Sequence, residues 1–140
     1  MSPERLFLVL GAVSSLIGVA LGALGTHALR ARLSPERLGQ FETGVRYQLW
    51  HALALFAVVF VESFRFWHPS ASAELYVFVG GMAWPAALAG WLFVAGTVLF
   101  SGSLYALALT GRRRWGMVAP LGGACFILGW ASLVLAAATA

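Results

Sequence analysis

Long uncharged runs of apolar residues, separated by short segments that carry the charges, organise this chain. An α-helix rises about 1.5 Å per residue, so about 20 apolar residues are needed to cross the hydrocarbon core of a bilayer. The first run, Leu6–Thr26, meets that length and contains no charge. It exceeds the roughly 7–15 apolar residues of a cleaved signal peptide, so we interpret it as a membrane span.

The second run is shorter and follows a helix start. Ser34 suits the N-cap and Pro35 the first turn, so the pattern predicts a helix that begins here and continues through Arg46. Its uncharged part, Tyr47–Val61, is only fifteen residues long. This helix can therefore span the membrane only if its polar first turns are sheltered by protein or lie at the interface.

The third run, Leu75–Gly111, is too long for one straight span and too short for two. Pro85 suits the first turn of a helix, and Gly111 suits the position just after its end. We therefore expect a short interfacial or re-entrant segment near residues 75–82, followed by a true span. A last apolar run follows the cluster Arg112–Arg114.

Together these runs predict an all-α fold, a membrane bundle of four transmembrane helices within one domain, residues 1–140. Both termini should then lie on the same side of the membrane. The expected spans cover residues 6–26, 45–63, 86–110 and 117–138.

Composition supports a membrane protein and excludes other classes. Hydrophobic residues make up 61% of the chain and charged residues only 10%, against roughly 25% charged residues in a typical soluble domain. The net charge of +4 does not indicate a nucleic-acid partner, because the arginines flank apolar runs. The single cysteine, Cys125, excludes an intrachain disulfide and a paired-cysteine metal or redox motif.

The arginines also predict an orientation. The first and third connections together carry Arg30, Arg32, Arg37 and Arg112–Arg114. The opposite side carries only Arg5 and Arg65. By the positive-inside rule, the arginine-rich side should face the cytoplasm.

Two of the spans contain a seam of small residues at the spacing of a helix–helix contact. In the first span the seam is formed by Gly11, Ser15, Gly18, Gly22 and Gly25. In the last span it is formed by Gly122, Cys125, Gly129, Ser132 and Ala136. Small residues let helix backbones approach closely in lipid, so the seams indicate close packing, either within the chain or between two copies in a homo-oligomer.

The second helix carries the most unusual polar residues. At 100° per residue, Tyr47, Gln48 and His51 share one face near the entrance of the bundle. His27, just beyond the first span, could approach the same end, which gives a candidate polar cluster of His27, Tyr47, Gln48 and His51. Glu42 and Arg46 lie on nearly the opposite face as an expected ion pair with i,i+4 spacing.

This cluster leaves several functions open. An ionisable residue at membrane depth is a functional-site hypothesis by default. The histidines could bind a metal or haem, relay protons, or only form hydrogen bonds between helices. Two histidines alone do not form a zinc site, and the sequence assigns neither a metal nor a cofactor. No nucleophile motif, phosphate-binding loop or zinc-protease motif occurs, so we name no catalytic residue.

Four motifs in order resemble a known family. They are Gly25-Thr26-His27-Ala28-Leu29, the segment 47–54, the segment 96–105, and Pro120-Leu121-Gly122-Gly123 with Gly129-Trp130. Together they resemble the YgdD-like family of small membrane proteins, a domain of unknown function found in bacteria and in a small vertebrate transmembrane protein. The resemblance implies a multi-pass protein of the bacterial cytoplasmic (inner) membrane, with no assigned reaction, substrate or cofactor.

The sequence thus favours a non-enzymatic membrane protein that binds a partner protein or a lipid within the membrane. A metal- or haem-binding protein that uses His27 and His51 is the first alternative. An oligomeric channel or transporter is the weaker alternative, because four short helices leave little room for a pathway in a monomer.

Overall fold

The computed structural model describes residues 1–67, 78–79 and 82–139. Within these residues, four helical stretches are long and apolar enough to span a membrane: Pro3–Leu29, Pro35–Phe64, Trp84–Thr110 and Arg113–Ala138. The expected all-α fold and its four spans are confirmed. Each helical stretch begins some residues earlier than the apolar pattern alone predicts.

Several of these stretches are built from more than one helical element. The α-helices are α1 (Pro3–Leu24), α2 (Pro35–Trp67), α3 (Trp84–Gly96), α4 (Gly102–Thr110) and α5 (Ala119–Ala138). Two π-helical turns, η1 (Gly25–Leu29) and η3 (Thr97–Ser101), continue α1 and join α3 to α4. A 3₁₀ turn, η4 (Arg113–Met117), precedes α5.

Local sequence signals set the helix ends. The Ser34 side chain accepts a hydrogen bond from the backbone N–H of Arg37 at 3.4 Å, and Pro35 is the first residue of α2, as expected. Gly111 ends α4 with φ 70°, a left-handed conformation that glycine adopts without steric cost. Its N–H donates to the carbonyl of Leu107 at 2.8 Å.

The connection between α2 and α3 contains the two short strands. β1 (Phe78–Val79) and β2 (Met82–Ala83) pair antiparallel. The interfacial or re-entrant segment expected near 75–82 lies mostly outside the described residues, and its described part is extended. Glu62 in α2 accepts a hydrogen bond from the N–H of Ala83 at 3.2 Å, which ties the end of α2 to the start of α3.

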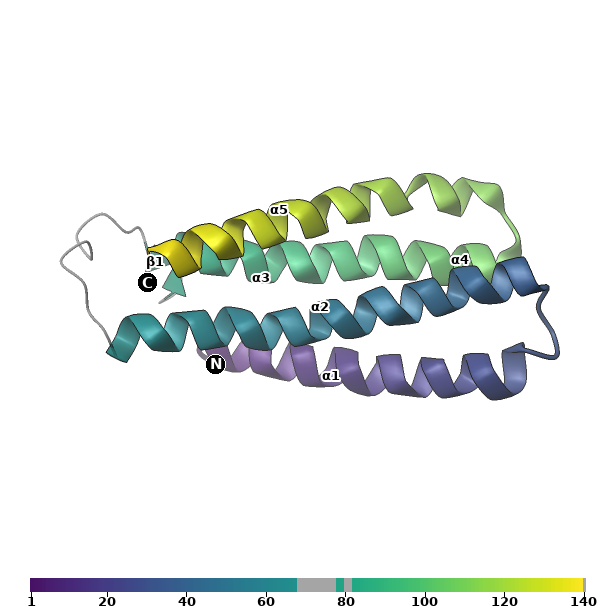
Figure 1. The fold of residues 1–140 in the computed structure, drawn as a ribbon, viewed down its shortest axis with the longest axis horizontal. Coiled ribbons are helices and arrows are strands. Elements are labelled where there is room, and N and C mark those ends of the chain that lie inside the picture. Colours follow the sequence, from purple (N-terminus) through teal and green to yellow (C-terminus); the bar gives the residue numbers. More distant parts are fainter. Residues whose placement is uncertain (68–77, 80–81, 140) are drawn as a thin grey trace.

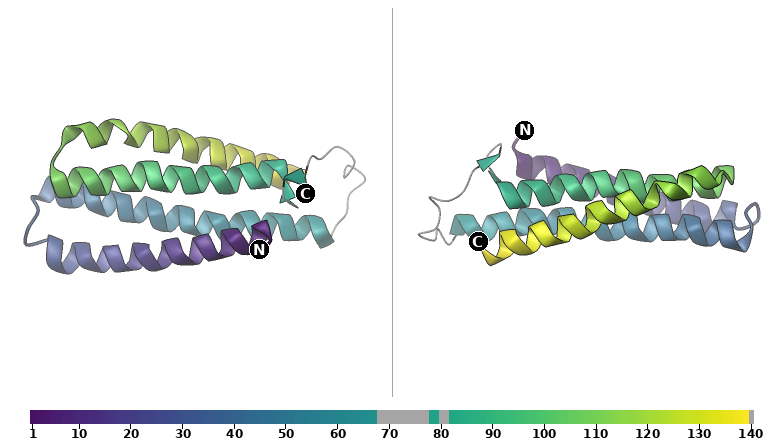
Figure 2. Two further views of the ribbon diagram at one scale, coloured as in Figure 1. Left: turned by 180° about the vertical axis from the view of Figure 1, so that it is seen from behind. Right: turned by 90° about the horizontal axis from the view of Figure 1, so that it is seen from above.

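The helices form an elongated antiparallel bundle (Figures 1 and 2). α1 packs mainly on α2, and α5 packs mainly on α3, whereas α2 contacts α1, α3, α4 and α5. Both termini lie at one end of the bundle, and the α1–α2 and α4–α5 connections lie together at the other (Figure 1). The two arginine-rich connections therefore share one end, as the sequence predicts.

The glycine seams hold different pairs of helices together. A Cβ added at Gly18 in α1 would lie 2.7 Å from Leu49 Cδ2 in α2, and one at Gly11 would lie 3.0 Å from the carbonyl oxygen of Ala52. In α5, a Cβ at Gly129 would lie 2.7 Å from the ring of Phe93 in α3. The two seams therefore do not pack against each other. The seam of α1 packs on side chains of α2, and the seam of α5 packs on side chains of α3.

The remaining seam glycines follow the same pattern. Gly22 faces Val45 and Gly25 faces Phe41, both in α2, and Gly122 lies against the backbone of Phe100 in η3. All six glycines predicted to pack thus contact another helix of the same chain.

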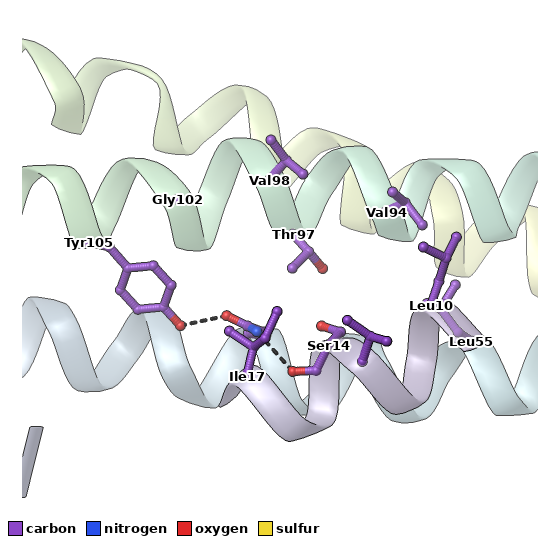
Figure 3. Close-up of a pocket in the computed structure, with 11 residues that line it drawn as sticks. Leu10, Ser14, Ile17, Leu55, Val94, Thr97, Val98, Gly102 and Tyr105 are labelled. Carbon is purple, nitrogen blue, oxygen red and sulfur yellow. Dashed lines mark hydrogen bonds between the residues drawn. The ribbon is translucent and has the colours of Figure 1, made fainter. Parts of the chain in front are cut away.

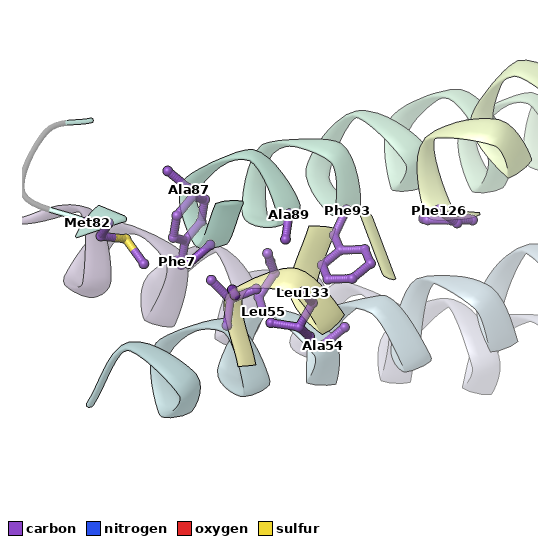
Figure 4. Packing of buried hydrophobic residues seen from close by; sticks show 12 residues of the cluster. Phe7, Ala54, Leu55, Met82, Ala87, Ala89, Phe93, Phe126 and Leu133 are labelled. Carbon is purple, nitrogen blue, oxygen red and sulfur yellow. The ribbon is translucent and has the colours of Figure 1, made fainter. Parts of the chain in front are cut away.

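The apolar core occupies the half of the bundle near the termini. One cluster of buried side chains from four helices includes Phe7, Leu55, Phe93, Phe126 and Leu133 (Figure 4). A smaller cluster of Phe41, Val45 and Ala108 lies nearer the arginine-rich end. Between them, the interior contains the polar side chains of α2.

Candidate functional site

The polar residues of α2 are divided between two sides of the helix. His51 and Tyr47 face α5, and Gln48 faces α1 and α4. Both His51 and Gln48 are buried. An ideal helical wheel places all three residues on one broad face, but that face is wide enough to contact two different neighbours.

His51 is enclosed by aromatic rings and has a partner for each ring nitrogen. Its ring stacks on Phe126 with centroids 3.4 Å apart and an interplanar angle of 8°. Nδ1 lies 2.8 Å from the carbonyl oxygen of Tyr47, and the indole N–H of Trp130 donates to Nε2 at 3.3 Å. The ring of Tyr47 also stacks against His51, with centroids 6.0 Å apart.

These partners determine the protonation state of His51. A backbone carbonyl only accepts and an indole N–H only donates, so Nδ1 carries the proton and Nε2 accepts. The ring is therefore a neutral imidazole whose only free lone pair is used by Trp130. In this arrangement His51 has no nitrogen available as a metal ligand.

His27 does not join this group. It is exposed on the π turn η1, and its neighbour Gly25 packs against Phe41 of α2. His51 lies ten residues farther along α2 than Phe41, which is about 15 Å along the helix axis. The antiparallel register of α1 and α2 therefore separates the two histidines and removes the basis for a shared metal or haem site. Among the described residues, no group of three or more metal-ligating side chains is present.

The expected ion pair is also not formed. Glu42 and Arg46 both have exposed side chains, and no salt bridge joins them in the described structure. Arg37, in the first turn of α2, donates through Nε to the carbonyl of Ala108 in α4 at 2.6 Å.

Gln48 connects three helices. Its Nε2 donates to the backbone carbonyl of Ser14 in α1 at 2.9 Å, and its Oε1 accepts from the hydroxyl of Tyr105 in α4 at 2.8 Å. The carbonyl of Ser14 can only accept, so the orientation of the amide is fixed, and Tyr105 must be the donor.

A groove lies directly beside this network (Figure 3). Near the termini α1 touches α3, where the ring of Phe7 covers Gly90. Beyond that contact a cavity of 390 Å³ lies between α1 and the α3–η3–α4 stretch, with Gln48 and Leu55 of α2 among its lining residues. The full lining set is Leu10, Val13, Ser14, Ile17, Gln48, Leu55, Val94, Thr97, Val98, Gly102 and Tyr105.

The groove is apolar at its rim and polar inside. Val13 and Ile17 on one side and Val98 on the other are 47%, 47% and 66% exposed, so the groove opens on the outer surface of the bundle. Inside it, the hydroxyls of Ser14 and Thr97 point toward the space between the helices (Figure 3). The Ser14 Oγ atom is buried and has no hydrogen-bond partner within residues 1–67, 78–79 and 82–139.

Sequence reasoning did not find most of these groups. The sequence does not single out Tyr105, because its direction depends on the π turn η3, which inserts an extra residue and rotates α4 relative to α3. Ser14 lies beside the small-residue seam and is not one of its members. The signal that the sequence offers is that both are polar residues inside an otherwise apolar span.

The fold defines a small multi-pass integral membrane protein, because four helical stretches are long and apolar enough to span a bilayer and their outer surfaces carry many exposed large hydrophobic side chains. The chain belongs to the family described as "Protein of unknown function (DUF423)", whose model matches residues 21–123. This confirms the family that the sequence motifs resemble.

Named relatives place the chain in the same class. It is 40% identical over 133 residues to the UPF0382 membrane protein YwdK of Bacillus subtilis, covering 95% of this chain and 96% of the relative. It is 37% identical over 136 residues to the UPF0382 inner membrane protein YgdD of Escherichia coli K12, covering 96% and 90%. The expected location in the inner membrane is confirmed. No solved structure matches the chain significantly.

Proposed function

We propose that this protein binds a lipid-soluble molecule within the bilayer, in the groove between α1 and the α3–η3–α4 stretch, and that it catalyses no reaction. The observation that carries the proposal is the buried Ser14 hydroxyl, which has no hydrogen-bond partner among the described residues and faces an open cavity. A buried polar group without a hydrogen bond costs free energy, and hydrocarbon cannot supply one. A ligand with a polar atom at this position would supply it.

The shape of the groove supports a ligand from the membrane. Its 390 Å³ lies within the roughly 300–1,000 Å³ of small-molecule sites. Its exposed rim, which includes Ile17 and Val98, lies in the hydrophobic part of the spans, so the molecules that reach it are those dissolved in the bilayer. A partner protein or a second copy of the chain is less well supported, because both glycine seams are already used within the chain.

Native mass spectrometry of the protein extracted in mild detergent tests the proposal. We expect a bound lipid-soluble molecule on the wild-type monomer and its loss in Val94→Trp, whose indole would fill the groove. Leu128→Trp is the matched control, because Leu128 is exposed on α5, far from the lining. Equal retention in wild type and Val94→Trp, or no retained molecule in any preparation of folded wild type, would overturn the proposal.

A further inference from the structure

The two hydroxyls in the groove differ from most other hydroxyls of the bundle. A serine or threonine within a helix usually bonds back to a carbonyl one turn earlier. The residues that do so here are Thr26, Thr43, Ser63, Ser103, Thr110 and Thr139. Ser14 and Thr97 do not, and neither hydroxyl is hydrogen-bonded to another described residue. Both therefore have a donor available for a ligand.

The depth of these hydroxyls restricts the ligand. Ser14 lies eleven residues into the stretch Pro3–Leu29, and Thr97 lies thirteen residues into Trp84–Thr110. These offsets correspond to about 17 and 20 Å along helices that are about 40 Å long. Both hydroxyls are thus close to the middle of the bundle, whereas the ester groups of a phospholipid lie at the edge of a hydrocarbon core about 30 Å thick.

The chemistry of the lining restricts it further. None of the eleven lining residues carries a charge, and a charged group at the bilayer centre is costly without a partner. The ligand is therefore neutral. The amide of Gln48 is already hydrogen-bonded through both its nitrogen and its oxygen, so among the described residues Ser14 and Thr97 carry the lining hydroxyls that make no hydrogen bond. A carbonyl oxygen has two lone pairs and can accept from both.

On these grounds, and resting on the proposed function, we infer that the ligand is a membrane quinone, with a ring carbonyl that accepts hydrogen bonds from the hydroxyls of Ser14 and Thr97. Quinones combine neutral carbonyls with a hydrocarbon tail and dissolve in the hydrocarbon interior of the bilayer. The exposed positions Ile17 and Val98 leave a lateral exit through which such a tail reaches the lipid. The inference concerns binding alone, and no electron transfer is part of it.

Calorimetric titration of the purified full chain with decylubiquinone, at fixed detergent concentration, tests the inference. We expect saturable binding to the wild type and binding about three- to thirty-fold weaker in Thr97→Val and in Ser14→Ala, the factor for one hydrogen bond in a membrane protein. Thr43→Val is the matched control, because its hydroxyl bonds to the carbonyl of Gly39 outside the groove. The unfolding temperature of each variant without ligand checks its fold.

The outcomes separate the inference from the proposed function. Equal affinity of wild type and the Ser14→Ala/Thr97→Val double variant would overturn the quinone assignment. Equally strong binding of decane, or displacement of decylubiquinone by oleate, would do the same and would indicate a site for a hydrocarbon chain. If the quinone assignment fails, the native mass spectrometry experiment still tests the proposed function. Loss of the retained molecule in Val94→Trp would support a lipid groove, and retention of that molecule in Val94→Trp would overturn the proposed function as well.

Discussion

The indole N–H of Trp130 in α5 donates to Nε2 of His51 in α2, with the two nitrogens 3.3 Å apart. This hydrogen bond joins two helices that make few other contacts. Because Nδ1 of His51 bonds to the carbonyl of Tyr47, protonating the ring would place two donors face to face and break the bond to Trp130. The histidine thus acts as a neutral link between helices.

We predict that His51 and Trp130 are energetically coupled. His51→Leu should lower the free energy of unfolding in detergent by about 1–2 kcal/mol, and Trp130→Phe by a similar or smaller amount, the range for polar contacts between membrane helices. The double variant should lose less than the sum of the two, by about 0.5–1.5 kcal/mol. Trp91→Phe, at an exposed position, is the control. Strict additivity would show that the bond contributes nothing.

Neighbouring glycines in α5 provide a second prediction. Gly122→Ala should destabilise the protein by about 1–3 kcal/mol, because the new methyl group would meet the backbone of Phe100, which cannot move as a side chain does. Gly123→Ala should be neutral or slightly stabilising, since nothing lies within 4 Å of its Cβ position. Thermal unfolding in detergent compares them, and equal melting temperatures would contradict this packing.

Arg37 should stabilise the bundle at its arginine-rich end. Its Nε bonds to the carbonyl of Ala108 in the last turn of α4, where a cation also interacts favourably with the helix dipole. We expect Arg37→Gln to cost about 1–2 kcal/mol of unfolding free energy and Arg114→Gln, at an exposed position, to cost much less. A loss of the same size in both would assign the effect to net charge and not to this bond.

The orientation of the bundle remains a prediction, which cysteine labelling tests. In a Cys125→Ser background, Ser34→Cys and Ser2→Cys place single exposed thiols at opposite ends. A membrane-impermeant maleimide should label Ser2→Cys in intact spheroplasts, and Ser34→Cys only after the membrane is permeabilised. The reverse pattern would place the arginine-rich end outside.

The spans and their packing faces could be predicted because lipid imposes strict local rules. The length of each apolar run predicts a span. Pro35 marks a helix start because proline suits the first turn, and Gly111 marks a helix end because glycine adopts the left-handed conformation. The seam glycines show where backbones approach, since small residues have few other uses inside an apolar helix. The sequence does not show which helix covers each seam, because that depends on the sizes of distant partners such as Leu49 and Phe93.

The candidate site could be predicted only in part, for two physical reasons. His51 and Gln48 are polar residues in an apolar helix and so are detectable, but a helical wheel cannot separate residues 60° apart that contact different neighbours. Tyr105 faces Gln48 because the π turn at Thr97–Ser101 changes the register of the helix. No residue type predicts such a turn. Ser14 and Thr97 are candidates because their hydroxyls make no hydrogen bond to another described residue, and only the packed structure shows this.

The sideways opening of the groove between Ile17 and Val98 has a consequence for measuring affinity. A ligand that enters from the hydrocarbon phase responds to its mole fraction in that phase and not to its amount per volume of buffer. Doubling the detergent or lipid at constant ligand should therefore halve the occupancy of a site that is far from saturated. Diluting the sample with buffer that contains detergent micelles should release the ligand, whereas adding the same volume of detergent-free buffer, with the micelles preserved, should not.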